Sequence, residues 1–578
     1  MPPKKSIEEI YKKLGDVEHV LKNPGMYIGQ ISKLKIEDWV INEKTKKIER
    51  KNINYSPGLY KIYDEILVNA ADHKMRDSSL NKITIDIDIE KNEISICNNG
   101  KGIPVEIHKE ENLYVPELIF GVLKTGTSYD ENDKKVIGGK HGLGAKLTAI
   151  HSREFTLETI DDERGLKYVQ TFKDNLSTKL KPKITKNKGK PYTKITFVPD
   201  LDRFETKSLN EDIYHLMKRR AYDISATTPK DVNIFFNGEK LEFKTFDKYG
   251  DMFLGTKEEN PRVYEMCNER WEIMASPSLN DQFQQVSFVN GIYTSNGGKH
   301  VDYILGQITK GLIEIIKKKN KNISIKESFV KENIWLFVKS TIENPDFNSQ
   351  TKETLTTPVK DFGSTCEVSK GFIKKLSETD IVDDILAIVE SKANKELKKT
   401  EGKKKGVLKG IKKLDDANKA GKKESSRCRL LLTEGDSAKT FAVSGLSVIG
   451  RDYYGVFPLK GKPLNVRDAD KKQVTNNEEL NNIKQIMGLQ HGKDYTKENL
   501  SDLRYGGIVI LTDQDVDGSH IKGLLLNLFH YYWPSLLKIP GFITVFNTPL
   551  IKATKKDEIK IFYNESEFKE WYKSNATK

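Results

Sequence analysis

The sequence predicts a multidomain protein of mixed α+β and α/β class, and three observations carry this prediction. At 578 residues the chain is too long for a single hydrophobic core. Two short apolar runs, 430–432 and 508–511, each end in an acidic cluster, as buried strands of a parallel sheet do at a ligand-binding edge. Upstream, a helix with a polar stripe is followed by glycine-rich loops, which predicts a separate ligand site.

Four carboxylates follow the two apolar runs: Glu434, and then Asp513, Asp515 and Asp517. The carboxyl ends of neighbouring parallel strands meet at one edge of a sheet, so we expect these side chains to converge. Like charges that share a site need a cation, and hard oxygen ligands favour Mg²⁺. An EF-hand is the alternative, but its loop needs a glutamate at the twelfth position, where Leu524 stands. A carboxylate site on two strands favours phosphoryl transfer on nucleic acid.

The helical pattern upstream places Glu65, Asn69 and Asp72 on one face. Asn98 then opens a turn with two glycines, and a second glycine-rich segment covers 138–146. Such loops let backbone N–H groups wrap phosphate at the start of a helix. The second loop is not a Walker A loop, because alanine stands where lysine is needed. Its strand and its ribose acid are misplaced for a Rossmann fingerprint.

Charge and cysteine content narrow the class of protein. Lys and Arg outnumber Asp and Glu by 96 to 83, and the net charge of +13 suits a polyanionic partner. Thirteen lysines against four acids give the segment 391–423 a charge of +9, typical of a solvated linker or of a segment that follows DNA.

Four scattered cysteines without a Cys-x-x-Cys pair disfavour a zinc site or a disulfide framework and fit a reducing compartment. No apolar stretch is long enough to predict a membrane span.

The segments around the acidic clusters resemble the TOPRIM module of topoisomerases and primases, in particular that of eukaryotic-type DNA topoisomerase II. The matching segments are 432–439 (Leu-Thr-Glu-Gly-Asp-Ser-Ala-Lys), 455–466 and 512–520. The resemblance implies that catalytic Mg²⁺ is held by Glu434, Asp513 and Asp515, with Asp517 assisting. It also implies DNA contacts by three basic side chains, Lys439, Lys460 and Lys462.

The upstream blocks resemble the GHKL (Bergerat) ATPase fold shared by gyrase B, Hsp90, MutL and histidine kinases. The resemblance implies that Glu65 is the general base for the attacking water, that Asn69 holds Mg²⁺ and that Asn98 meets the adenine amino group. It further implies nucleotide binding by Asp72, Gly126, Thr127, Ser128, Gly139, His141, Gly142, Gly144, Ala145 and Lys146. His73 departs from the family pattern, and we expect it to be merely solvent-exposed.

Downstream, the alternating segment 286–294 predicts a strand that breaks at a Ser-Asn-Gly-Gly turn. The polar loop 344–352 is by its residues a surface turn, but it resembles the Gln-Thr-Lys loop of the ribosomal-S5-like transducer domain of topoisomerases. That resemblance implies that Lys352 reaches the γ-phosphate, with Gln350 and Thr351 beside it. A basic run is interpreted either as a helix end that complements the dipole or as a DNA contact, and it comprises Lys317, Lys318 and Lys319.

The resemblance covers residues 20 to 570, and the chain is identified as a member of the type IIA DNA topoisomerase family, of eukaryotic or viral type. The expected domains are a GHKL ATPase with an N-terminal strap (1–225), a transducer (226–390), a Lys-rich linker (391–425), a Rossmann-like TOPRIM domain (426–550) and the start of a further segment (551–578). The family implies ATP and Mg²⁺ as cofactors, double-stranded DNA as a partner, a homodimer and no membrane contact. It also implies an intracellular, DNA-associated location, in the nucleus or at a viral replication site.

The family cleaves DNA with a tyrosine that follows arginine in a winged-helix domain. The one adjacent pair here, Arg504-Tyr505, precedes the second acidic strand and is rejected as the nucleophile. We therefore expect a truncated chain, or one subunit of a split enzyme whose winged-helix and coiled-coil region acts in trans. Such a chain would hydrolyse ATP (as part of EC 5.6.2.2) and would not cleave DNA alone. The alternatives are a GHKL-type repair or chaperone ATPase, and a TOPRIM nuclease or primase with an unrelated ATPase.

Overall fold

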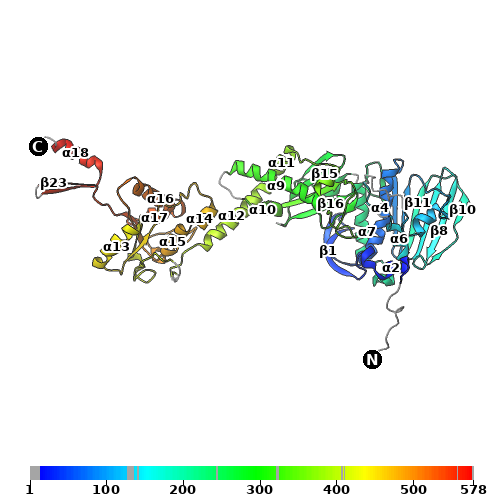
Figure 1. The fold of residues 1–578 in the computed structure, drawn as a ribbon, viewed down its shortest axis with the longest axis horizontal. Helices are drawn as coiled ribbons and strands as arrows, with labels where there is room; N and C mark the ends of the chain where they lie inside the picture. The colour runs from blue at the N-terminus through cyan, green and yellow to red at the C-terminus, as the bar shows by residue number, and fades with distance from the viewer. Residues whose placement is uncertain are drawn as a thin grey trace, which may run out of the picture. The chain divides into compact units, whose positions relative to one another are not determined.

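The computed structural model describes residues 13–125, 136–139, 142–242, 245–280, 282–320, 325–404, 408, 411–555 and 558–575. The chain divides into two compact units, Met1–Ile315 with Glu327–Asp384, and Ile316–Lys326 with Ile385–Lys578. The first unit contains two mixed sheets with helices, and the second contains a wholly parallel sheet with helices on both faces (Figure 1). The predicted combination of α+β and α/β classes is confirmed.

The larger sheet of the first unit has nine strands in the order β10-β8-β7-β11-β4-β3-β12-β13, with β9 paired to β8. Its strands are β3 (Lys82–Asp88), β4 (Glu93–Asn99), β7 (Ser152–Asp161), β8 (Leu166–Lys173), β9 (Thr178–Lys179), β10 (Lys183–Lys186), β11 (Tyr192–Pro199), β12 (Asn233–Phe236) and β13 (Glu239–Lys240). Three helices pack against this sheet, namely α4 (Pro57–Arg76), α6 (Gly144–Ile150) and α7 (Glu211–Thr227) (Figure 1). They cover the face on which the candidate site lies.

The helix α4 forms where the sequence analysis expects a helix. Ser56 caps its N-terminus by accepting a hydrogen bond from the Leu59 N–H, and Pro57 occupies the first turn, where its missing N–H costs nothing. Ile62 and Ile66 are buried against the sheet. This packing fixes the rotation of α4 and with it the direction of its polar stripe.

The smaller sheet of the first unit has the order β14-β15-β18-β16-β17. Its strands are β14 (Val263–Asn268), β15 (Trp271–Pro277), β16 (Gln284–Val289), β17 (Ile292–Tyr293) and β18 (Ile334–Ser340). The prediction of one strand across 286–294 is wrong, because Asn290 and Gly291 have φ values of 50° and 75° and turn the chain into a hairpin between β16 and β17. Asn-Gly is a strong signal for this tight turn, since both residues tolerate positive φ.

The remaining elements of the first unit complete its core. They are α2 (Asp16–Lys22), α3 (Pro24–Tyr27), β1 (Leu34–Ile41), β2 (Ile48–Tyr55), β5 (Ile107–His108), β6 (Leu113–Tyr114), α5 (Val115–Gly121), α8 (Phe246–Leu254), α9 (Lys299–Lys319), α10 (Glu327–Glu332) and α11 (Lys370–Ser377). One hydrophobic cluster joins the two sheets, with Ile62 and Phe155 at the larger sheet and Phe288 and Trp335 at the smaller. The two sheets therefore share one core.

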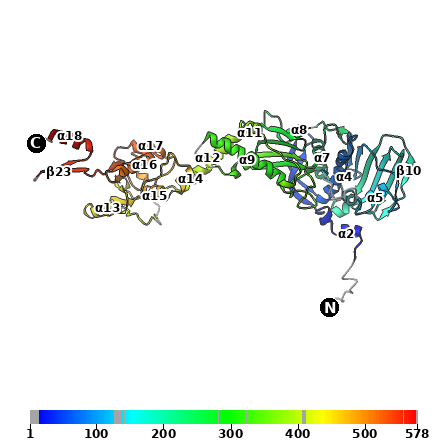
Figure 2. The same cartoon turned by 45° about the horizontal axis from the view of Figure 1, so that its top comes forward.

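The second unit is built on a parallel sheet in the order β20-β19-β21-β22. Its strands are β19 (Arg429–Thr433), β20 (Tyr454–Pro458), β21 (Gly507–Leu511) and β22 (Ile543–Val545). The helix α13 (Asp436–Ile449) follows β19 and the helix α16 (Val516–Tyr532) follows β21, on opposite sides of the sheet (Figures 1 and 2). The predicted parallel strands are confirmed, and the strand order reverses between β19 and β21, where ligands bind in such folds.

The Lys-rich segment differs from a solvated linker. Its first part belongs to the helix α12 (Ile381–Lys399), and further on Ala417 and Ala420 are buried in the core of the second unit. Asp415 forms a backbone bridge to Val456 in β20, the strand that pairs with β19. The described lysines of this segment therefore reach solvent from a backbone whose described parts pack on the second unit.

The other elements of the second unit are α14 (Lys471–Asn476), α15 (Glu478–Met487), α17 (Pro534–Leu537), β23 (Ile551–Lys555), β24 (Glu558–Phe562) and α18 (Glu565–Asn575). Of the helices that the structure describes, none combines the length and the apolar character that crossing a membrane requires.

Candidate active site

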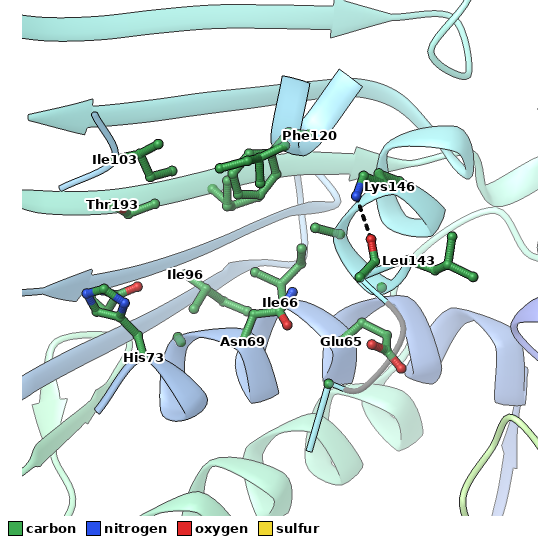
Figure 3. A pocket seen from close by; sticks show the side chains of 18 of the residues that line it. Glu65, Ile66, Asn69, His73, Ile96, Ile103, Phe120, Leu143, Lys146 and Thr193 are labelled. Carbon is green, nitrogen blue, oxygen red and sulfur yellow. Dashed lines mark hydrogen bonds between the residues drawn. The ribbon is translucent and has the colours of Figure 1, made fainter. Parts of the chain in front are cut away.

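A cavity of about 410 Å³ opens in the first unit between α4 and the glycine-rich segment that precedes α6. Figure 3 shows Glu65, Asn69 and His73 along α4, with Lys146 and Phe120 on the opposite wall. Helical spacing of three and four residues puts these α4 side chains on one face. The cavity is large enough for a small-molecule ligand of nucleotide size.

Glu65 lies between two ammonium groups at the inner end of the cavity. The Nζ atom of Lys61, one helical turn earlier, is 2.6 Å from Glu65 Oε1, and the Nζ atom of Lys352 is 3.7 Å from the same oxygen. Burial alone would raise the pKa of Glu65, but the two lysines outweigh it and lower this pKa to about 2. Glu65 is therefore an ionised carboxylate throughout the neutral range.

Lys352 reaches Glu65 from the segment that follows β18 in the smaller sheet. Its Nζ atom also donates a hydrogen bond of 3.1 Å to the Gly138 carbonyl, and the side chain is buried. The backbone of Lys352 has a φ of 61°, an unfavourable conformation for a residue with a long side chain. The contact with Glu65 is thus made by a lysine in a strained backbone conformation, which indicates a functional constraint.

Buried Asp72 holds the glycine-rich segment in place from α4. Its carboxylate accepts hydrogen bonds from the N–H groups of Gly138 (3.0 Å) and Gly139 (2.9 Å). A Cβ atom on Gly144 would lie 2.0 Å from Glu65 Oε2, so only glycine fits at the start of α6 while Glu65 keeps its position. The close approach of this backbone to α4 is what gives the cavity its narrow end.

Lys146 supplies a third ammonium group, on the wall opposite α4. Its Nζ atom donates to the Gly142 carbonyl at 2.5 Å (Figure 3) and to the Thr125 carbonyl. Burial lowers the pKa of Lys146 to about 8, because water is excluded from the ammonium group. An anionic ligand that replaced the two carbonyls would stabilise the charged form.

The other end of the cavity is mainly apolar. Its wall is formed by Ile66, Ile96, Ile103, Pro104, Ile119, Phe120 and Ile195. Asn98 and Thr193 stand directly opposite each other on β4 and β11 and add two polar side chains to this wall. A flat heterocycle with polar edges matches such a lining.

Most residues that the sequence analysis assigns to a nucleotide site line this one cavity. They are Glu65, Asn69, Asn98, Gly139, Gly142, Gly144, Ala145, Lys146, Gln350 and Lys352. Asp72 lies behind the glycine-rich segment, and Thr351 packs against Gly29, whose Cβ would be 2.7 Å from Thr351 Cγ2. Gly126, Thr127, Ser128 and His141 lie outside the described residues.

His73 is not merely solvent-exposed as the sequence analysis expects. It is half-buried, lines the cavity and makes a 3.1 Å hydrogen bond to the Lys101 carbonyl. Lys61 was not predicted as a site residue, although its position four residues before Glu65 is a signal for a helical ion pair. No sequence pattern marks Phe120 and the other apolar wall residues, because in the sequence they look the same as ordinary core residues.

The acidic residues of the second unit lie at the carboxyl ends of β19 and β21. The Asp513 N–H donates a 3.1 Å hydrogen bond to Glu434 Oε2, so these two residues are in direct contact. Asp515 Oδ1 caps α16 by accepting from the Gly518 N–H at 2.7 Å, and Asp517 pairs with Lys462 at 2.9 Å. Within the described ranges, no three acidic, histidine or cysteine side chains are close enough together to hold a metal ion. The structure thus brings Glu434 to Asp513, while Asp515 and Asp517 have other partners.

The lysines proposed for DNA contact differ in their surroundings. Lys439 is half-buried, with its Nζ atom 2.8 Å from Asp415 Oδ2, whereas Lys460 and Lys462 are exposed near the acidic edge. Lys317, Lys318 and Lys319 form the exposed last turn of α9. Tyr505 is fully buried and accepts a 2.9 Å hydrogen bond from the Ala417 N–H. This burial agrees with its rejection as a nucleophile.

Three families of known domains match the chain in order. Residues 54–201 match the histidine kinase-, DNA gyrase B-, and HSP90-like ATPase family, residues 241–405 match the DNA gyrase B family, and residues 429–548 match the Toprim domain. The ATPase match contains the cavity residues of α4, and the Toprim match contains both acidic clusters. Fold and sites therefore define a protein of the GHKL ATPase class that also contains a Toprim domain.

Relatives match nearly the whole chain. DNA topoisomerase 2 of Arabidopsis thaliana is 50% identical over 99% of this chain and 39% of its own length. DNA topoisomerase 2-alpha of Homo sapiens is 50% identical over 98% of this chain, which spans 37% of that relative. Among solved structures, the ATPase region of Saccharomyces cerevisiae topoisomerase II is 46% identical with a TM-score of 0.63, covering 67% of this chain and 100% of that one. The chain belongs to the type IIA DNA topoisomerase family, of eukaryotic or viral type.

Proposed function

We propose that this chain is the ATPase, transducer and Toprim part of a type II DNA topoisomerase, and that it uses ATP to close a gate around a DNA duplex. The observation that carries the proposal is the meeting of Glu65 from α4, the glycine-rich segment and Lys352 from the smaller sheet at one cavity. Further support comes from the acidic edge at Glu434 and Asp513 in the same chain, and from relatives named DNA topoisomerase 2 along nearly its whole length.

In the proposed reaction, the adenine of ATP occupies the apolar end of the cavity, and the triphosphate lies along the glycine-rich segment beside Lys146. Glu65 accepts a proton from a water molecule as the water oxygen bonds to the γ-phosphorus and the bond to the leaving ADP oxygen breaks. General base catalysis contributes roughly 10²–10⁴-fold to such a step. Positioning by the backbone N–H groups and neutralisation of charge supply the rest.

Lys352 couples this reaction to the smaller sheet. Phosphate oxygens would compete with the Glu65 carboxylate for the Lys352 ammonium, which is 3.7 Å from Glu65 Oε1. When Lys352 turns to the γ-phosphate, Glu65 loses one of the two charges that keep its pKa at about 2 and becomes a stronger base. Release of phosphate returns Lys352 to Glu65, so its segment changes position with the state of the nucleotide.

Divalent cations complete both sites in this proposal. Carboxylate oxygens at a strand-order reversal fit a hard cation such as Mg²⁺, although side-chain rotation is needed before three of them meet. Glu434, Asp513 and Asp515 would hold the ion at the acidic edge with Asp517 beside them, and Asn69 would hold one in the ATP cavity. The cation would neutralise phosphate charge in each place.

The DNA partner follows from charge and from the relatives. A net charge of +13 attracts a polyanion, and exposed Lys460 and Lys462 stand beside the acidic edge. Two copies would form the gate, and a winged-helix region, in cis or in trans, would supply the tyrosine for cleavage and religation. The location would be intracellular and DNA-associated, in the nucleus or at a viral replication site.

ATP hydrolysis by the wild-type chain and by Glu65→Ala, each with and without linear duplex DNA, tests this function. We expect duplex DNA to stimulate wild-type turnover, and Glu65→Ala to lose roughly 10²-fold or more because no group accepts the water proton. Glu565→Ala, which removes an exposed i,i+4 ion pair with Lys569, is the matched control. Unchanged turnover in Glu65→Ala would overturn the catalytic assignment, and wild-type turnover indifferent to DNA would overturn the DNA partner.

A further inference from the structure

Two cysteines that lie far apart in the sequence are in contact in the first unit. Cys267 lies in β14 and Cys366 lies in the segment that leads into α11, 99 residues later, yet their Sγ atoms are only 2.7 Å apart. Both are free thiols, with Cys366 buried and Cys267 partly exposed. The scattered spacing of the four cysteines does not predict this pairing.

We propose that Cys267 and Cys366 form a reversible disulfide bond, with a small-molecule disulfide such as glutathione disulfide as the oxidant. The bond length of a disulfide is about 2.05 Å, so the sulfur atoms need to approach by less than about 1 Å from their separation of 2.7 Å. Adjustment of the two side chains brings them to this length. No other pair of thiols in the described part of the chain has a contact of this kind.

The backbone around both cysteines is already held in place. The Asn268 side-chain amide donates to the Thr365 carbonyl at 2.8 Å, and the Gln307 amide donates to the Cys366 carbonyl at 2.9 Å. Further on, the Ser369 N–H donates to Glu265 Oε1 at 3.1 Å. Because these bonds order the segment before any oxidation, the second thiol acts at high effective concentration.

The exchange proceeds in two balanced steps. The partly exposed Cys267 thiolate attacks one sulfur of glutathione disulfide, and one glutathione leaves as a thiolate that takes up the released proton. Cys366 then attacks the Cys267 sulfur, the protein disulfide forms, and the second glutathione leaves with the second proton. The protein is oxidised by two electrons, and one glutathione disulfide is reduced to two glutathione molecules.

The order of attack follows from the surroundings of the two thiols. Contact with the Cys267 thiol, and then burial, raise the pKa of Cys366. The accessible Cys267 is therefore the first to react. The contact that raises the pKa of Cys366 is lost once Cys267 carries glutathione, so Cys366 becomes able to act as the resolving thiol.

The disulfide would join β14 of the smaller sheet covalently to the segment between β18 and α11. Lys352 and Cys366 lie on the same connection between β18 and α11, fourteen residues apart. A bond from Cys366 to β14 would fix the far end of this connection. The modification therefore falls on the segment that carries the lysine of the nucleotide cavity, without touching that cavity.

Treatment of the full chain with glutathione disulfide, followed by intact-mass measurement and thiol titration, tests the proposal. We expect the wild type to lose two hydrogen atoms, to retain no glutathione and to fall from four titratable thiols under denaturing conditions to two. Peptide mapping should link Cys267 to Cys366, and dithiothreitol should restore all thiols. Cys97→Ser is the control and should form the same bridge.

Variants of the two cysteines separate the two steps of the exchange. Cys267→Ser should form no bridge, and because Cys267 is only partly buried this variant should fold normally. Cys366→Ser should stop at the mixed disulfide, with one glutathione retained on Cys267. A wild-type protein that keeps all its thiols, that retains glutathione on Cys267, or that links other cysteines would overturn the proposal.

Discussion

Glu65 is held by two lysines with different roles. Lys61 comes from the same helix and stays beside Glu65 at 2.6 Å, whereas Lys352 comes from another sheet and is 3.7 Å away. Lys61, Glu65 and Lys352 are all buried. Each of their charges depends on the other two, because an unpaired charge in the interior costs free energy of folding. Lys61 is best described as a positioning residue that keeps the Glu65 carboxylate ionised and aimed at the cavity.

Replacing Lys61 should change the pH dependence of ATP hydrolysis. Burial raises the pKa of Glu65 and the two lysines lower it to about 2, so Lys61→Met should raise this pKa. Glu65 then becomes protonated as the pH falls through the higher pKa, and kcat/KM should decrease on the acidic side. A pH profile from roughly pH 5 to 8 measures this effect.

Lys61→Arg is the matched variant, since it keeps the charge beside Glu65 and should keep the wild-type acidic limb. A profile for Lys61→Met that superimposes on that of the wild type, after correction for stability, would show that Lys61 does not set the pKa of Glu65.

Side-chain patterns predicted the centre of the site better than its walls. Glu65 and Asn69 were predicted because a polar stripe at helical spacing, weak as a signal by itself, precedes glycine-rich loops in the order that the GHKL family shows. Phe120 and the apolar wall could not be found, because a lining residue and a core residue have the same character in sequence. The contact between Cys267 and Cys366 depends on pairing between distant segments, which local patterns do not encode.

Among the elements, the start of α6 has a strict geometric requirement at Gly144. A Cβ atom at position 144 would lie 2.0 Å from Glu65 Oε2, so Gly144→Ala should displace the carboxylate. We expect kcat for ATP hydrolysis to fall by about 10²-fold, the usual cost of misplacing a catalytic group by about 1 Å. Gly306→Ala in α9, where an added Cβ meets nothing within 4 Å, should leave kcat unchanged. Equal rates for the two variants would contradict the tight fit at α6.

The pairing of α4 with α7 depends on a buried ion pair. Arg220 Nε is 2.7 Å from Asp64 Oδ1, and Arg220 also donates to the Gly291 carbonyl at 2.8 Å, which ties both helices to the β16–β17 hairpin. Arg220→Met would leave Asp64 without its closest partner and should lower the free energy of unfolding by about 3–5 kcal/mol. Denaturant unfolding measures this change.

A surface pair provides the comparison for that experiment. Lys22→Met removes an exposed i,i+4 pair with Glu18 and should cost less than about 0.5 kcal/mol. If Arg220→Met cost no more than Lys22→Met, the buried pair would not hold α4 to α7.

The strands were predictable wherever local patterns decide their position. Apolar runs before acidic clusters predicted β19 and β21, because buried parallel strands have this pattern. The hairpin at Asn290-Gly291 was missed because the alternation continues through the turn. Local patterns left the Lys-rich segment open between a solvated linker and a segment that follows DNA, because its few apolar residues, such as Ala417 and Ala420, gave no sign that they pack onto the second unit.

Across the whole molecule, one chain combines a nucleotide cavity in its first unit with an acidic edge in its second. In the proposed function these two sites act in one cycle that uses ATP and DNA. In the proposed cycle Lys352 carries the signal, because its ammonium group reaches Glu65 from the loop that follows the smaller sheet's strand β18.

A crystal structure of the chain with a non-hydrolysable ATP analogue and Mg²⁺ tests this proposal most directly. We predict that the analogue lies in the cavity with its γ-phosphate beside Glu65, and that Lys352 Nζ has left Glu65 for a γ-phosphate oxygen. An analogue bound elsewhere, or a Lys352 that still pairs with Glu65 while nucleotide fills the cavity, would contradict it.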